Sequence, residues 1–226
     1  MGALHIVVYA EGAAERLAGR SSARLPTAPG HPLQEDEHGP AHILVKRALA
    51  EVCERPPQSL TFDAPLRWRG RQPKGSDLLN ERTLKMLLRW PRPTLAPDLA
   101  VVLIDCDGEK DRKQRLEEVI AAPSRATQHV VAMSIQEFEA WLIADIQTVN
   151  DVLETTIDEP ANPENMQPGD AKEAFLRWCN HEADNIDEND ARCDIVRNLD
   201  FDTLSRRCSA FETFLSDIRE ASEQLD

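Results

Sequence analysis

Three apolar runs along the chain predict buried strands. They are "LHIVVYA" (4–10), "PDLAVVLID" (97–105) and "QHVVAMS" (128–134), each rich in β-branched residues. The run at 97–105 is continuous in Leu, Val and Ile, which indicates burial on both faces, as in a parallel sheet. The shorter run "SLTFD" (59–63) is compatible with a further short strand.

The segments between and after these runs have the apolar spacing of amphipathic helices. This alternation of strands and helices predicts an α/β fold with a mostly parallel sheet flanked by helices. Ser76 is the expected N-cap of one helix. "SIQE" has the form of a capping box, with Ser134 as the cap and Glu137 bonding back to its N–H. The predicted helices cover residues 39–54, 76–90, 109–122 and 135–154.

The composition changes after residue 154. An acidic, proline-containing connector, "TTIDEPANPENMQPGD", is followed by helical stretches near residues 170–180, 188–198, 200–207 and 209–223. We therefore expect an α/β domain over residues 1–154 and an acidic helical extension over residues 155–226 that packs on it.

Length and composition exclude several classes of protein. The 226 residues suffice for one sizeable core, and the lack of an 18-residue apolar run predicts no membrane span. The beginning "MGALHIVVYAEG" has no basic region typical of a signal peptide, so we expect a cytoplasmic protein without membrane partners. The five scattered cysteines contain no CxxC pair, which argues against a disulfide framework or a zinc ribbon.

The charge is unevenly distributed along the chain. The formal net charge is −14, and residues 134–226 hold 7 Lys and Arg against 23 Asp and Glu. The segment 67–92, which we call the basic strip, holds 8 Lys and Arg against 2 Asp and Glu. Such a strip can face a phosphate backbone, but it also suits a solvated surface or a docking site for an acidic partner. The candidate nucleic-acid contacts are Arg67, Arg69, Arg71, Lys74 and Lys85.

Carboxylates follow the ends of the predicted strands. Glu11 follows the first strand, and "DCD" places Asp105 and Asp107 at the end of another. In a parallel sheet these ends meet at one edge, where ligands bind. Residues i and i+2 of an extended segment point the same way, so the two aspartates can reach one Mg²⁺ while Cys106 points away. The motif alone is weak evidence for a metal site, because aspartate is common in the turns that follow strands.

Further acidic residues are weaker candidates. Glu139 lies in the first turns of an apolar helix. Its carboxylate can either belong to the site or face solvent. Glu15 would share a helix face with Glu11 if residues 11–18 are helical. Asp145 lies six residues past Glu139 and cannot share its side of the helix closely. Glu15 and Asp145 are therefore secondary candidates.

The motifs together resemble the TOPRIM fold of topoisomerases, primases and overcoming-lysogenisation-type nucleases. More closely, the chain resembles the bacterial TOPRIM-like family named domain of unknown function 4276. The matching pieces are "YAEGAAE", "KGSDLL", "VVLIDCDGEKD", "EFEAWLIAD", "PGDAKEAF" and "LDFDTLSRRCSAFETFLSDI".

The resemblance implies roles for individual residues. Glu11 would be the TOPRIM glutamate, active in acid/base chemistry and at the metal, and Asp105 and Asp107 would help to hold Mg²⁺ or Mn²⁺. Glu139 would be a further catalytic acid, and Lys74 would face phosphate. TOPRIM-like proteins of this kind often accompany ATPases in anti-phage defence, where they act as effector nucleases.

Two hypotheses follow. The chain is either a Mg²⁺-dependent nuclease acting on DNA or RNA, with an AAA- or ABC-type ATPase as partner, or a non-catalytic TOPRIM-like module that docks on such an ATPase. A separation above about 10 Å between the carboxyl group of Glu11 and those of Asp105 and Asp107 would exclude a shared Mg²⁺ ion. A primase-like nucleotidyl transferase is disfavoured, since the sequence offers no zinc or NTP-binding accessory element.

Overall fold

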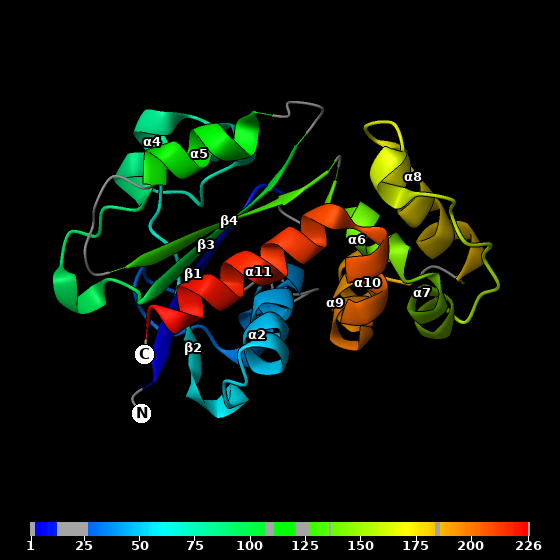
Figure 1. Ribbon diagram of the computed structural model, residues 1–226, viewed down its shortest axis with the longest axis horizontal. Coiled ribbons are helices and arrows are strands. Elements are labelled where there is room, and N and C mark those ends of the chain that lie inside the picture. The colour runs from blue at the N-terminus through cyan, green and yellow to red at the C-terminus, as the bar shows by residue number, and fades with distance from the viewer. Residues whose placement is uncertain are drawn as a thin grey trace.

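The protein is built on a four-stranded, fully parallel sheet with the strand order β2-β1-β3-β4. The computed structural model describes residues 3–12, 27–106, 111–120, 127–135, 137–183 and 186–225. The predicted α/β fold is confirmed: a parallel sheet flanked by helices, with a helical C-terminal part (Figure 1). The strands are β1 (Leu4–Ala10), β2 (Leu60–Phe62), β3 (Leu99–Asp105) and β4 (Gln128–Ser134).

Side chains of the strands alternate between two apolar layers, because successive residues of a strand point to opposite faces. Val101 and Leu103 of β3 belong to the larger layer, and Val102 and Ile104 belong to the smaller one. Both faces of the sheet are thus buried. This accounts for the continuous apolar run of β3, which the sequence predicted for a parallel sheet.

The larger layer is covered by helices from both halves of the chain. α2 (Pro40–Val52) packs beside α11 (Ser209–Glu223), and α11 runs along β4 (Figure 1). α9 (Glu188–Asn198) packs on α2, and α10 (Phe201–Arg207) packs on α11. One continuous hydrophobic cluster therefore joins the sheet to the C-terminal helices.

The smaller layer is covered by α3 (Gly75–Leu78), α4 (Glu81–Leu87) and α5 (Arg112–Ile120). The prediction of one helix over residues 76–90 with Ser76 as its cap was wrong. Asn80 interrupts the helix and accepts a hydrogen bond from the backbone N–H of Thr83, so it caps a second helix. Most of the basic strip belongs to this layer, whereas the acidic C-terminal helices lie on the other side of the sheet.

The predicted helix over residues 135–154 is also two helices, α6 (Phe138–Ala144) and α7 (Ile146–Leu153). Asp145 separates them and accepts a hydrogen bond from the backbone N–H of Thr148 (3.2 Å), so it is the N-cap of α7. The predicted capping box was wrong as well. Ser134 is still part of β4, and Glu137 takes the N-cap position of α6.

The connector after residue 154 ends at α8 (Asp170–Arg177), which continues into a π-helical turn, Trp178–Glu182. Glu164 fixes the connector to α11, since its carboxylate accepts hydrogen bonds from the backbone N–H groups of Ser209 and Ala210.

None of the described helices combines the length and apolarity needed to cross a membrane. Short 3₁₀ helices occur at Glu35–Glu37, Pro57–Ser59, Pro93–Leu95 and Pro163–Asn165.

Candidate active site

Glu11 reaches from the end of β1 to the end of the neighbouring strand β3. Its backbone N–H donates to the carbonyl oxygen of Leu103 (3.0 Å), which continues the parallel ladder by one residue. Its side-chain Oε2 accepts a hydrogen bond from the backbone N–H of Asp105 (2.9 Å). The two acidic motifs, 94 residues apart in sequence, therefore meet at the carboxyl edge of the sheet, as predicted for parallel strands.

Gly75 lies directly against the carboxylate of Glu11. A Cβ atom at Gly75 would lie 2.3 Å from Oε1 and 2.4 Å from Cγ of Glu11, closer than non-bonded atoms approach. Gly75 is the first residue of α3, inside the "KGSDLL" motif. The absence of a side chain there leaves the space that Glu11 occupies between α3 and the end of β3.

Asp105 is held from the other side by β4. Its Oδ1 accepts a hydrogen bond from the hydroxyl of Ser134 (2.6 Å), which is fully buried at the end of that strand. The two residues are also register partners in the β3–β4 ladder. On the α5 side, Nη1 of Arg112 donates to the backbone carbonyl of Asp105. Contacts from three elements thus fix the position of this aspartate.

These carboxylates fit the donor chemistry of a hard divalent cation. Because Oε2 of Glu11 bonds the amide of Asp105, the two carboxyl groups lie within about 7 Å of each other by ordinary covalent geometry, inside the limit for a shared ion. Mg²⁺ is usually held by one or two carboxylates together with water and phosphate oxygens. Within the described residues, no group of three His, Cys, Asp or Glu side chains is arranged to hold a metal. Asp107 and Glu15, two of the predicted residues, lie outside the described residues.

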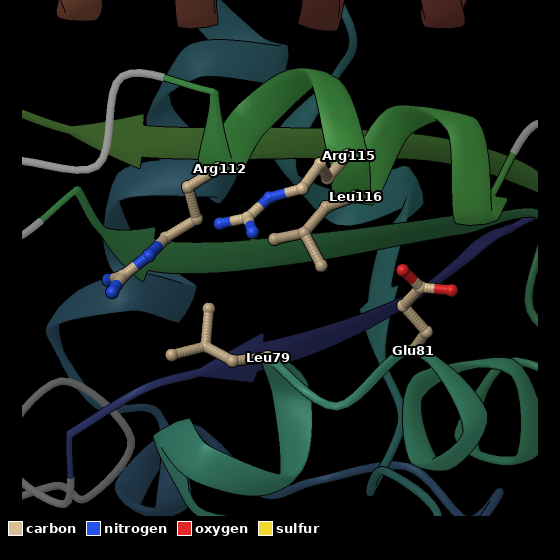
Figure 2. A pocket seen from close by; sticks show the side chains of 5 residues that line it. All are labelled: Leu79, Glu81, Arg112, Arg115 and Leu116. Carbon is tan, nitrogen blue, oxygen red and sulfur yellow. The ribbon is translucent and has the colours of Figure 1, made fainter.

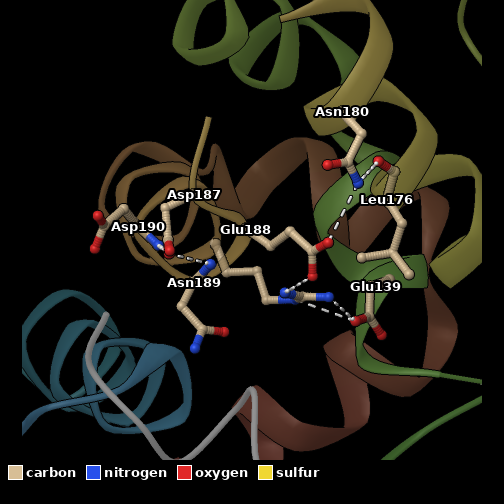
Figure 3. Close-up of polar contacts among 8 residues, drawn as sticks. Glu139, Leu176, Asn180, Asp187, Glu188, Asn189 and Asp190 are labelled. Atoms are coloured by element: carbon tan, nitrogen blue, oxygen red, sulfur yellow. Dashed lines mark hydrogen bonds and ion pairs between the residues drawn. The ribbon is translucent and has the colours of Figure 1, made fainter. Parts of the chain in front are cut away.

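Glu139 and Asp145 have partners of their own. Glu139 is buried in α6, and its Oε1 accepts hydrogen bonds from Nε (3.1 Å) and Nη2 (2.8 Å) of Arg192 on α9. Glu188 and Asn180 complete the surrounding polar network (Figure 3). Asp145 is the N-cap of α7, and it also accepts a hydrogen bond from the backbone N–H of Asp200 (2.8 Å). Both carboxylates therefore have structural roles, and the catalytic role predicted for Glu139 stays a prediction.

The five cationic candidates of the basic strip differ in their surroundings. Arg67 is half-buried and donates to the carbonyl oxygen of Thr27, and Arg71 forms an ion pair with Asp77 (2.7 Å). Hydrogen bonding by Arg71 lowers the pKa of Asp77 below its ordinary value. Arg69, Lys74 and Lys85 are exposed, and so is Arg71. Because Arg67 is half-buried and Asp77 engages Arg71, the other three cations are better placed to meet a phosphate backbone.

Sequence reasoning missed several residues around the site. Ser134 was assigned to a helix cap, and Gly75 and Arg112 were not considered as part of a site. The contacts of all three depend on how distant elements pack. The position of Ser134 at the end of a strand beside "DCD" was the one signal in the sequence that could have indicated its contact with Asp105.

Comparison with known proteins assigns the family. The model of the family described as "Domain of unknown function (DUF4276)" matches residues 39–219, and the chain belongs to this family. No curated protein matches the chain. Among solved structures, the C-terminal region of the Xanthomonas campestris pv. campestris OLD protein is similar, with 14% identity, 98% of this chain and 97% of that chain covered, and a TM-score of 0.43. The interpretation of the site therefore rests on the geometry of this chain.

Proposed function

We propose that the protein is a Mg²⁺- or Mn²⁺-dependent nuclease that hydrolyses phosphodiester bonds at the carboxyl edge of its sheet. The contact between Oε2 of Glu11 and the amide of Asp105 carries this proposal, because it joins acidic residues from two adjacent parallel strands. Glu11, Asp105 and Asp107 would hold the cation. A divalent ion bound there would activate water and stabilise the leaving oxygen.

The residues of the chain would contribute mainly by positioning. Ser134 and the amide of Asp105 hold the two carboxylates in place before a cation binds, which lowers the cost of reorganising them. Glu11 lies within reach of the same edge and is the candidate for acid/base chemistry. The exposed cations Arg69, Lys74 and Lys85 would attract the nucleic-acid backbone.

The cellular role is proposed from the TOPRIM resemblance. The protein would be the effector nuclease of an anti-phage system, kept inactive or recruited by a separate ATPase subunit. The acidic C-terminal helices offer a surface opposite to the basic layer for such a partner. In the alternative, the same surfaces serve a docking module without nuclease activity.

Nuclease assays with isosteric variants test the proposal. We expect the wild type to cleave DNA or RNA with Mg²⁺ or Mn²⁺, and Glu11→Gln and Asp105→Asn to lose this activity while keeping their hydrogen-bond acceptors. Binding of Mn²⁺, followed by electron paramagnetic resonance, should weaken in the same variants. Glu220→Gln, an exposed change on α11, is the matched control.

Expression in cells separates the two candidate functions. A nuclease effector should be toxic in a manner that Asp105→Asn abolishes and a cognate ATPase modulates. If the wild type and Asp105→Asn have the same activity and the same toxicity with the ATPase present, the catalytic assignment is wrong and the docking module is favoured.

A further inference from the structure

A small cavity lies between α5 and the α3–α4 segment, on the side of the sheet that carries the basic strip (Figure 2). Its volume is about 230 Å³. Two arginines of α5 line it together with two leucines and one glutamate. The lining residues are Leu79, Glu81, Arg112, Arg115 and Leu116.

Arg112 connects this cavity to the candidate active site. The residue is 6% exposed, and its Nη1 donates to the backbone carbonyl of Asp105. The guanidinium is therefore held at the end of β3, beside the residue proposed to bind the cation. A guanidinium has five N–H donors, so one arginine can bind more than one acceptor at a time.

Arg115 adds a second guanidinium to the same side of the cavity. It follows Arg112 by three residues on α5, and residues at this spacing are neighbours on a helix surface. Figure 2 shows both side chains leaving the same side of α5, with Leu79 of the α3 end across the cavity. Arginine pairs of this kind bind phosphate oxygens with defined geometry.

The size and walls of the cavity restrict what it can hold. Pockets for whole small molecules usually measure about 300–1,000 Å³, so a cavity of about 230 Å³ suits one phosphate group with adjoining atoms. Leu79 and Leu116 provide apolar contact for sugar carbons. Glu81 stands on the α4 side, where its negative charge opposes an anion and weakens its binding.

We propose that this cavity binds one phosphodiester group of the nucleic-acid substrate next to the scissile bond, with Arg115 contacting the phosphate and Arg112 positioning it relative to Asp105. The inference rests on the proposed nuclease function. It assigns to Arg112 and Arg115 a substrate contact on the α5 side of the carboxylates.

Binding assays without divalent cations test the cavity separately from catalysis. Short labelled single-stranded DNA and RNA are titrated in EDTA against the wild type, Arg115→Gln, Glu81→Gln and Arg82→Gln. Arg82 lies on α4 outside the cavity, so its substitution removes the same charge from a neighbouring place. Circular dichroism confirms that each variant is folded.

We expect Arg115→Gln to weaken binding about 5- to 10-fold and to lower the salt slope by about one, and Arg82→Gln to have a clearly smaller effect. Glu81→Gln should tighten binding severalfold, because it removes the opposing charge. Arg112→Lys, which keeps the charge, should lower the cleavage rate more than it weakens binding.

Two outcomes would overturn the inference. These are equal effects of Arg115→Gln and Arg82→Gln, or no binding of either oligonucleotide by the wild type. The proposed nuclease function fails on a different result, namely unchanged cleavage by Glu11→Gln and Asp105→Asn. If Arg112→Lys does not fold, Arg115→Gln and Glu81→Gln decide the question.

Discussion

Glu139 and Arg192 form an ion pair inside the protein, with the glutamate 2% exposed and the arginine 1% exposed. The pair joins the beginning of α6 to α9 across 53 residues of sequence. The guanidinium also lies over the ring of Phe175, 4.8 Å from its centroid. This link connects the helix that follows β4 to the C-terminal helices.

Breaking this ion pair should destabilise the protein strongly. Arg192→Met leaves a buried carboxylate without its cation, which typically costs about 3–5 kcal/mol of unfolding free energy. Urea denaturation measures the change. Arg197→Met on the same helix removes an exposed arginine from an ion pair with Asp194 and should cost less than about 1 kcal/mol.

The double variant Glu139→Leu/Arg192→Met separates stability from catalysis. Apolar replacement of both partners should recover much of the lost stability. Loss of cleavage at recovered stability would support the catalytic role predicted for Glu139, whereas retained cleavage would leave it a purely structural role. Equal stability of Arg192→Met and the wild type would contradict the importance of the pair.

Gly75→Ala should impair the site while leaving the fold intact. The new methyl group would displace the Glu11 side chain and break its hydrogen bond to Asp105. We expect cleavage to fall at least tenfold, with unfolding free energy changed by less than about 1 kcal/mol, because alanine favours the helix. Parallel cleavage assays and urea denaturation measure both quantities.

Gly169→Ala is the matched control for that substitution. Gly169 has a φ of +95° and open space around its Cβ position. Its replacement should cost about 1 kcal/mol of stability through backbone strain, with cleavage unchanged. Full activity of Gly75→Ala would show that Glu11 need not hold the observed position.

The exposed cations of the basic strip should dominate long-range attraction of nucleic acid. Combined replacement of Arg69, Lys74 and Lys85 by Gln should lower the dependence of binding on salt by up to about one logarithmic unit per contacted phosphate. Fluorescence anisotropy over a series of salt concentrations measures this. An unchanged salt slope would favour the use of the strip as a docking surface for an acidic partner.

His42 should make stability depend on pH. Burial, with a smaller effect of the neighbouring His38, lowers the pKa of His42 to about 3. The unfolded chain takes up the proton near the ordinary pKa of about 6.5, so it binds more protons than the native state below that pH. The contribution is present above pH 6.5 and is lost progressively as the pH falls towards 3.

Urea denaturation at two pH values measures the effect of His42. Between pH 7 and pH 5, the wild type should lose about 2 kcal/mol more unfolding free energy than His42→Phe. The phenylalanine keeps an aromatic ring beside Phe62, which His42 contacts edge-on. The same pH dependence in both proteins would contradict a native state with neutral His42.

The sequence predicted the sheet well because a strand that is buried on both faces has a continuous run of apolar residues. β1, β3 and β4 have seven residues each and contain an apolar run with two or three β-branched side chains, so the sequence places them within two residues of their ends. Their parallel pairing then brought the ends of β1 and β3 together. The proximity of Glu11 and Asp105 followed from topology alone.

The contacts that refine the site could not be read in the same way. The ion pair of Glu139 depends on the position of Arg192, and the space for Glu11 depends on Gly75, which lies 64 residues away in sequence. The breaks at Asn80 and Asp145 were missed because apolar periodicity continues across them. In both places a local side-chain cap ends the longer helix.

The two helical layers carry opposite charges, so the electrostatic potential differs between the two faces of the molecule. An approaching polyanion is repelled by the acidic helices around α11 and attracted by the layer of α3, α4 and α5. Encounters would therefore be oriented before contact, with the carboxyl edge of the sheet reached from the basic side. Judged by the net charge of −14 alone, association with a polyanion would become faster as salt screens the repulsion. We expect the opposite: the association rate should fall as the ionic strength rises, as it does for a cationic protein.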